Sequence, residues 1–155
     1  MKTYNPFQLF SLVLLRVLIG WHLLYEGIVK VMDASWSSGD FLANAQGPIA
    51  GFFHHLASDN TLLFVVDIVN EWGLILIGLS LILGFFTRVG TLVGILLLTL
   101  YYLANPPLLG VSLGANIEGS YLIVNKNLIE AAGLLVLFAF RTSHLYGLDR
   151  FFARR

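Results

Sequence analysis

Four long apolar segments run through the chain and limit its possible folds more than any other feature. They cover approximately residues 7–32, 62–86, 89–103 and 120–140. A helix needs about 20 residues to cross the hydrocarbon core of a bilayer, because each residue adds about 1.5 Å of length. The sequence therefore predicts an all-α integral membrane protein, folded as one four-helix bundle domain over residues 1–155.

The composition supports this assignment and narrows the classes of function. Hydrophobic residues make up 57% of the chain and charged residues 12%, against about 25% charged in a typical soluble domain. The net charge is zero and no basic patch is present, which excludes nucleic acid as an expected partner. Cysteine is absent, which excludes disulfides and thiol redox chemistry. A redox role would therefore need a bound cofactor or a diffusible carrier such as a quinone.

The distribution of positive charge predicts the orientation in the membrane. If the N-terminus is inside, only Lys126, with Lys30 at the rim, falls on the outer side. The inner side then holds Lys2, Arg88, Arg141, Arg150, Arg154 and Arg155. This asymmetry follows the positive-inside rule and predicts a multi-pass protein of a bacterial cytoplasmic membrane with both termini in the cytoplasm. Residues 48–58, in the first outer loop, are expected to form a short helix at the membrane surface.

The first apolar segment contains ionisable residues on one helical face. At 100° per residue, an arc of about 120° holds Leu12, Arg16, Ile19, Gly20, Leu23, Glu26, Gly27 and Lys30, with His22 just beside it. A charge at mid-membrane costs about 2.5–3.5 kcal/mol, so this face should point into the bundle. The glycines on it allow another helix to approach closely.

The second segment has a comparable stripe. It consists of Asp67, Asn70, Glu71, Leu74, Gly78 and Leu81. Asp67 and Glu71 are one turn apart and would repel each other if both were ionised, so we expect one of them to hold a proton. Together with Glu26, they form a candidate proton relay and are the predicted catalytic residues.

The polar residues of all four segments fall in the outer half of the membrane, except Arg16, which lies deeper, toward the inner half. Tyr101, Tyr102 and Asn105 close the third segment there, and Lys126 and Glu130 open the fourth. The sequence thus predicts a polar groove between the helices. The predicted substrate-binding residues are Arg16, Trp21, His22, Lys30, Trp72, Tyr101, Tyr102 and Glu130. No metal site is predicted.

Several of these residues also have structural interpretations. Glu26 and Lys30 are spaced for a partly exposed ion pair at a helix end. Arg16 can extend to the inner interface or bind a backbone carbonyl. Glu130 has the spacing of a helix-capping box that begins at Asn127. Tryptophans in membrane proteins are often interface anchors, which applies to Trp21 and Trp72.

Two stretches resemble the DoxX and DoxD-like membrane proteins. NEWGLILIGLSLILGFFTR, residues 70–88, is similar to the second-helix pattern of this family, with a glutamate, spaced glycines and a closing Thr-Arg. The first helix is similar in its Leu15-Arg16, Gly20 and Gly27-to-Lys30 pattern. FFHHLASDN and EGSYLIVNKNLIE look closest to the DoxD branch, named for the large subunit of thiosulfate:quinone oxidoreductase.

The resemblance implies a four-helix membrane protein, associated in part of the family with thiosulfate oxidation coupled to quinone reduction. Two hypotheses therefore remain open. The chain is a membrane redox subunit whose groove takes a quinone as substrate, or it is a non-catalytic accessory, chaperone-like or lipid- or partner-binding subunit of a larger complex. In both, the lipid bilayer is a partner, and the first hypothesis leaves room for a second subunit that binds the sulfur anion.

Overall fold

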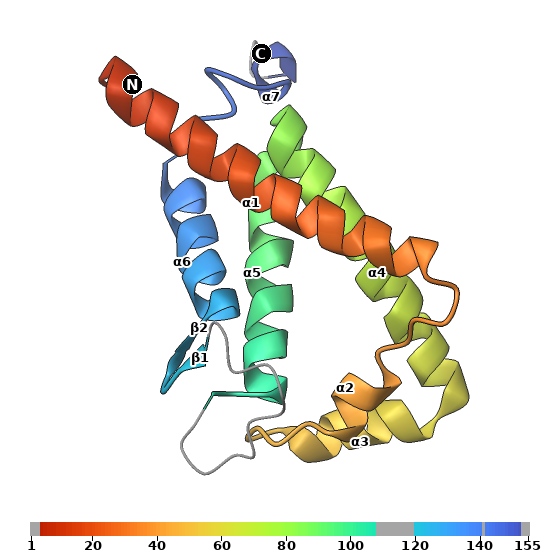
Figure 1. Cartoon of the computed structure of the whole chain (residues 1–155). Helices are drawn as coiled ribbons and strands as arrows, with labels where there is room; N and C mark the ends of the chain where they lie inside the picture. Colours follow the sequence, from red (N-terminus) through yellow and green to blue (C-terminus); the bar gives the residue numbers. More distant parts are fainter. Residues whose placement is uncertain (1–3, 108–119, 141, 153–155) are drawn as a thin grey trace.

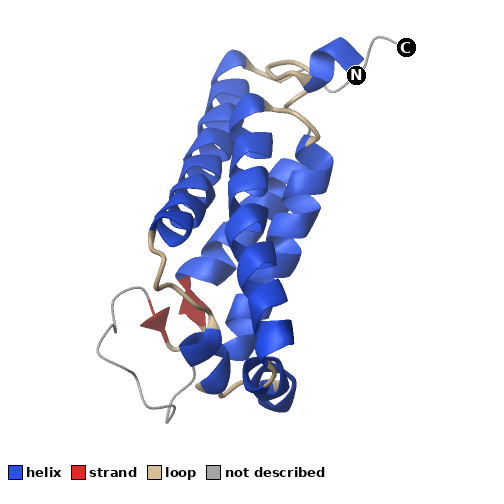
Figure 2. Ribbon diagram, turned by 90° about the vertical axis from the view of Figure 1, so that its right-hand side faces the viewer, coloured by secondary structure: helices blue, strands red, loops and turns tan. Residues whose placement is uncertain are grey.

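Helices form most of the structure. The computed structural model describes residues 4–107, 120–140 and 142–152. Its elements are α1 (Pro6–Met32), α2 (Gly39–Ala43), α3 (Ala50–Ser58), α4 (Asn60–Leu83), α5 (Thr87–Ala104), β1 (Ser120–Tyr121), β2 (Val124–Asn125), α6 (Lys126–Ala139) and α7 (Asp149–Phe152). Figure 1 shows α1 crossing obliquely in front of α4 and α5, with α6 beside α5. Figures 1 and 2 place α7 and the start of α1 at one end of the molecule, and α2, α3 and the two strands at the other.

Helices α1, α4, α5 and α6 share one apolar core. Its buried members are Ile19, Leu23, Leu74, Ile77, Leu81, Leu98, Leu134 and Leu137. In α1, α4 and α6 they recur at helical spacing, as expected for helices that bury one face and leave the other for lipid, and α5 contributes Leu98. The inward face predicted for the first segment is confirmed, because Arg16, Ile19, Gly20, Leu23 and Gly27 are all buried.

Three helices are long and apolar enough to cross a membrane in the part of the chain that the structure describes. They are α1, α4 and α5. Helix α6 has 14 residues, which gives a length of about 21 Å at 1.5 Å per residue. That is shorter than the hydrocarbon core of about 30 Å, so α6 does not complete a span by its helical residues alone. Residues 120–125, expected to belong to this helix, instead form the antiparallel strand pair β1–β2 and its turn.

Helices α1 and α4 pack closely because glycines meet at their crossing. A Cβ atom added to Gly78 would lie 2.6 Å from the carbonyl oxygen of Gly20 and from the backbone nitrogen of Leu24. Such distances are far inside van der Waals contact. Hydrogen at these positions lets the two backbones touch, as is typical of helix pairs in membranes.

The α4–α5 connection is displaced slightly from its expected place. Helix α4 begins at Asn60, where Asp59 caps it, and ends at Leu83, followed by the C-cap Gly84, whose φ of 65° is left-handed. The segments expected at 62–86 and 89–103 are thus helices over 60–83 and 87–104. The turn between them has Phe86 at a φ of 49°, and Asp149 accepts hydrogen bonds from the backbone N–H groups of Phe86 and Thr87.

Helix α3 confirms the short helix expected within residues 48–58. It packs beside α2, which the sequence did not predict, around a second small core of Leu42, Ala45, Phe53 and Ala104. The backbone N–H groups of Gln46 and Gly47 donate to the carbonyl oxygen of Ala104. These contacts fix the α2–α3 segment at the end of α5.

Candidate functional site

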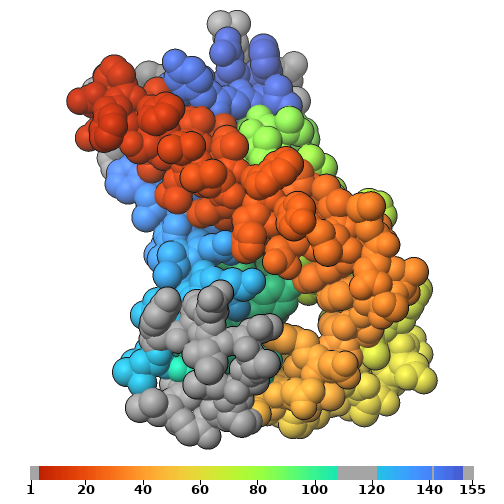
Figure 3. Space-filling view, in the orientation of Figure 1, coloured from red at the N-terminus to blue at the C-terminus, as the bar shows by residue number. Residues whose placement is uncertain are grey.

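A cavity lies beneath α1 at the end of the bundle that carries α2 and α3. Its volume is about 290 Å³. It is lined by His22, Leu23, Glu26, Lys30, Trp36, Ser37, Ser38, Phe41, Asn70, Leu74, Leu98, Tyr101, Lys126, Asn127 and Glu130. We call it the interhelical pocket, since α1, α4, α5 and α6 all contribute to it. Figure 3 shows the opening between α1 and α2.

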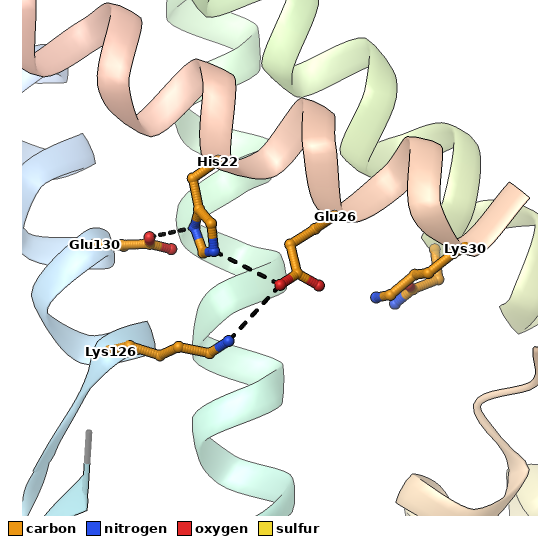
Figure 4. Close-up of polar contacts among 6 residues, drawn as sticks. His22, Glu26, Lys30, Lys126 and Glu130 are labelled. Atoms are coloured by element: carbon orange, nitrogen blue, oxygen red, sulfur yellow. Dashed lines mark hydrogen bonds and ion pairs between the residues drawn. The ribbon is translucent and has the colours of Figure 1, made fainter. Parts of the chain in front are cut away.

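One side of the pocket carries an acid–base cluster. His22 Nδ1 lies 2.5 Å from an oxygen of Glu130, and His22 Nε2 lies 3.6 Å from an oxygen of Glu26. The ammonium of Lys126 is 3.9 Å from the same Glu26 oxygen. Figure 4 shows His22 between the two carboxylates, which come from α1 and α6. Because each imidazole nitrogen faces a carboxylate, the cluster is suited to hold and pass on a proton.

Helical spacing positions these four residues. His22 and Glu26 are four residues apart on α1, so both project from one face. Lys126 and Glu130 are four residues apart in the first turns of α6. Asn125 caps α6 by accepting a hydrogen bond from Leu128 N–H. The capping box expected to begin at Asn127 is wrong, because the cap lies two residues earlier, and the carboxylate of Glu130 pairs with His22 instead.

The other side of the pocket carries a chain of hydrogen bonds. The ammonium of Lys30 donates to Asn70 Oδ1 at 2.9 Å, and Asn70 Nδ2 donates to the hydroxyl of Tyr101. The same ammonium lies 4.9 Å from the ring centre of Trp36 and 5.7 Å from that of Tyr101. The partly exposed Glu26–Lys30 ion pair considered from the sequence is therefore not what the structure shows. Lys30 is bound by an amide and two aromatic faces.

Asp67 holds the segment that covers this side of the pocket. Its carboxylate accepts hydrogen bonds from the hydroxyl of Ser37 at 2.8 Å, and from the backbone N–H and hydroxyl of Ser38. This anchors the start of α2, from which Phe41 packs edge-on against Tyr101 at 5.8 Å between ring centres. Asp67 itself is not among the residues that line the pocket.

The structure brings five predicted site residues together and leaves six outside. His22, Glu26, Lys30, Tyr101 and Glu130 line the pocket. Trp21 and Trp72 project outward, with 61% and 53% of their surfaces exposed. The hydroxyl of Tyr102 donates to the carbonyl of Ile123. Glu71, like Asp67, lies on α4 but is absent from the pocket lining.

Arg16 lies away from the pocket, at the end of the bundle that carries α7. It is buried, with 3% of its surface exposed. Its guanidinium donates to the carbonyl oxygen of Tyr146 at 2.6 Å and to the hydroxyl of Thr142 at 3.4 Å. This agrees with the structural interpretation, in which Arg16 binds a backbone carbonyl.

The site predicted from the sequence did not include several residues that line the interhelical pocket. Asn70 was placed on the polar stripe of the second segment but not among the binding residues, although its amide joins Lys30 to Tyr101. Trp36 and Phe41 lie in a loop and a short helix, where no periodic pattern indicates a partner. An asparagine flanked by two acidic residues inside an apolar helix is the signal that identifies Asn70.

Two kinds of chemistry are available in this pocket. The acid–base cluster can give or take protons, and Lys30, Asn70 and Tyr101 can hydrogen-bond an acceptor. Across residues 4–107, 120–140 and 142–152, no three His, Cys, Asp or Glu side chains are arranged to hold a metal ion.

Comparison with known proteins identifies one matching family. A family model described as DoxX matches residues 11–104, which run from α1 to the end of α5. No curated protein and no solved structure matches the chain. The matched residues include His22, Glu26, Lys30, Asn70 and Tyr101, whereas Lys126 and Glu130 lie beyond them.

Proposed function

Because this chain belongs to the DoxX family of membrane proteins, we propose that its interhelical pocket binds the ring of a quinone within a membrane oxidoreductase. One observation carries the proposal. The acid–base cluster and the Lys30–Asn70–Tyr101 chain lie on two sides of one cavity, and Figure 4 shows Glu26 as the labelled cluster residue on the side of Lys30. A para-quinone has its two carbonyl oxygens on opposite sides of its ring, so each can meet one of these groups.

The walls of the pocket also suit a flat ring. Trp36, Phe41 and Tyr101 supply aromatic surfaces, and Leu23, Leu74 and Leu98 supply aliphatic ones. A site with mostly apolar walls and a few polar groups is typical of small-molecule binding. Its place within a bundle of apolar helices gives a membrane-dissolved carrier access without passage through water.

Quinone reduction adds two electrons and two protons to give a quinol. The protons enter through His22, which exchanges them with Glu26 and Glu130. The electrons come from a reductant outside the chain, since the sequence contains no cysteine and no residue that is itself an ordinary electron carrier. In the thiosulfate:quinone oxidoreductase-like form of the proposal, the reductant is thiosulfate, bound by a second subunit.

The same absence of a carrier residue favours a second candidate. In this alternative the chain is a non-catalytic accessory subunit of a larger membrane complex, and a lipid or partner helix fills the pocket. The two candidates differ in what the pocket contains. Quinone in the pocket supports the first, and lipid or a partner helix supports the second.

The test uses gently solubilised protein together with its native partners. Extraction should yield quinone in near-stoichiometric amount, and membranes that contain the complete complex should reduce quinone when thiosulfate is added. Lipid or a partner segment in the pocket, with no quinone, would support the accessory candidate. If quinone is bound but is not reduced when thiosulfate is added, the pocket is still a quinone site, and thiosulfate is not the reductant.

A further inference from the structure

The hydrogen bonds on the Lys30 side of the pocket have a fixed direction. A lysine ammonium has three donors and no acceptor. The Asn70 atom that faces Lys30 must therefore be its oxygen, at 2.9 Å from Nζ. This settles which way the amide is turned, a choice that heavy-atom positions alone leave open.

The direction continues to Tyr101. With its oxygen toward Lys30, Asn70 presents its NH₂ group to the hydroxyl oxygen of Tyr101, which must accept. The hydroxyl hydrogen of Tyr101 is then left for another acceptor. Among the described residues, no hydrogen bond uses that hydrogen, although Tyr101 is largely buried and lines the pocket. A hydroxyl donor that is not used within the protein, on the wall of a pocket, is available to a ligand that supplies an acceptor.

We propose that the Tyr101 hydroxyl donates to a carbonyl oxygen of the bound ligand, and that Asn70 is the positioning residue that turns the hydroxyl toward it. This inference rests on the proposed function, since the carbonyl is that of the quinone. Successive hydrogen bonds polarise one another, so the positive charge of Lys30 strengthens the donor at the end of the chain. The carbonyl at this end is thereby polarised before any proton arrives from the acid–base cluster.

Replacing Asn70 by aspartate separates this role from a merely structural one. Aspartate has nearly the same shape, but both of its oxygens accept. It would keep the contact with Lys30 as an ion pair and would accept the Tyr101 hydrogen, turning that hydrogen away from the pocket. A structural role would tolerate Asn70→Asp, whereas a positioning role would not.

The test measures binding of a short-chain ubiquinone, ¹³C-labelled at one carbonyl carbon at a time, to detergent-solubilised protein. We expect Tyr101→Phe and Asn70→Asp each to raise the Kd about tenfold, the size of one lost hydrogen bond in a buried site. In wild-type protein one labelled carbonyl should show a lowered infrared stretching frequency, and both variants should lose that shift. Tyr25→Phe, on the exposed face of α1, is the matched control and should bind as wild type.

The double variant decides how Asn70 acts. If Asn70 works through Tyr101, then Asn70→Asp with Tyr101→Phe should bind no more weakly than Tyr101→Phe alone. If the double variant binds ubiquinone more weakly than either single variant, the new carboxylate acts by its charge and the positioning role is overturned. Wild-type binding by Asn70→Asp would overturn that role as well. Unchanged binding by Tyr101→Phe would overturn the donor. Failure of wild-type protein to bind the ubiquinone would instead remove the quinone assignment, and this inference with it.

Discussion

Arg16 is a buried cation whose polar partners, among the described residues, lie in the C-terminal segment. Its guanidinium bonds Thr142 and Tyr146, and its positive charge also interacts with Asp149. Only 3% of its surface is exposed, and it lies within a membrane-spanning helix, where an uncompensated charge would be costly. Arg16 therefore fastens residues 142–149 to α1.

Replacing Arg16 by methionine tests this role. The change keeps most of the aliphatic volume but leaves the Tyr146 carbonyl and the Thr142 hydroxyl without a donor. We expect the free energy of unfolding in detergent to fall by about 3 kcal/mol, while the Kd for ubiquinone stays unchanged. Arg88→Met is the control, because Arg88 is exposed and its guanidinium lies over the ring of Phe138 at 5.3 Å. Weakened ubiquinone binding at unchanged stability would restore the substrate-binding role predicted from the sequence.

The acid–base cluster makes a separate prediction about the proton route. Glu130→Gln keeps a group that can hydrogen-bond His22 but cannot take up a proton. We expect thiosulfate-dependent quinone reduction to fall about 100-fold, the low end of general acid–base contributions, with little change in stability. The sequence analysis also placed Glu71 in the candidate relay, so Glu71→Gln should be compared with Glu130→Gln in the same membranes. A greater loss in Glu71→Gln than in Glu130→Gln would place the relay on α4.

Residue patterns alone predicted some of this site but not all. Period-3.6 spacing was enough to place Glu26, Lys30 and Asn70 on inward faces, because a charge in lipid is costly. Which groups meet depends on how the helices cross. The pairing of His22 with Glu130 needs the α1–α6 crossing, and the bonds from Ser37 and Ser38 to Asp67 need the folded loop. Neither contact can be predicted from the residue pattern of one segment alone.

At the scale of the element, the α1–α4 crossing depends on glycines. Gly78 faces the backbone of Gly20 and Leu24, whereas a Cβ atom at Gly73, five residues earlier on α4, would meet nothing within 4 Å. We expect Gly78→Ala to lower the free energy of unfolding by about 1–3 kcal/mol through overpacking. Gly73→Ala should leave it unchanged or raise it, since alanine favours a helix. Equal thermal unfolding of the two variants would show that the crossing has room for a methyl group.

Asp149 joins α7 to the start of α5. Its pKa lies below the ordinary 3.8: burial alone would raise it, but hydrogen bonds from Ser143, Phe86 and Thr87 favour the carboxylate more strongly. Since the folded pKa is lower than the unfolded one, the carboxylate stabilises the fold above about pH 3.8, and that contribution is lost as the pH falls through the folded value. The wild type should therefore unfold at higher temperature than Asp149→Asn at pH 6, and the two should converge only as the pH falls below the folded pKa of Asp149, which lies under 3.8. Parallel curves over this range would contradict the capping role.

The boundaries of the helices and strands show how far a local sequence pattern can predict structure. Helix α1 was predicted to within one residue from its apolar run alone, and in the structure Asn5 caps its start with Pro6 as the first helical residue. The α4–α5 turn moved because Gly84 ends α4 and Asp149, which is 62 residues from Thr87 along the chain, caps α5. The hydrophobicity of residues 120–125 resembled a helix, but the strand pair β1–β2 occupies them. Distant caps and strand partners are not visible in a local pattern.

At the scale of the whole molecule, the two ends of the bundle differ in composition. Figure 1 shows the start of α1 and α7 at one end, and α2, α3 and the strands at the other. Arg88 and Arg150 belong to the first end, while the interhelical pocket with Lys30 and Lys126 belongs to the second. The short α6 begins at the level of the pocket, so its acidic and basic residues reach the cavity from its first two turns.

This division predicts which end faces the cytoplasm. The chain has no cysteine, so a single introduced thiol reports one position. His144 is exposed at the α7 end, and Asn44 is exposed between α2 and α3. By the positive-inside rule, a membrane-impermeant maleimide added to intact spheroplasts should label Asn44→Cys and should label His144→Cys only after the membrane is opened. The reverse pattern would put the pocket on the cytoplasmic side, so that protons for quinone reduction would come from the cytoplasm. Labelling of both thiols in intact spheroplasts would mean that α6 and its flanking residues do not return the chain across the membrane.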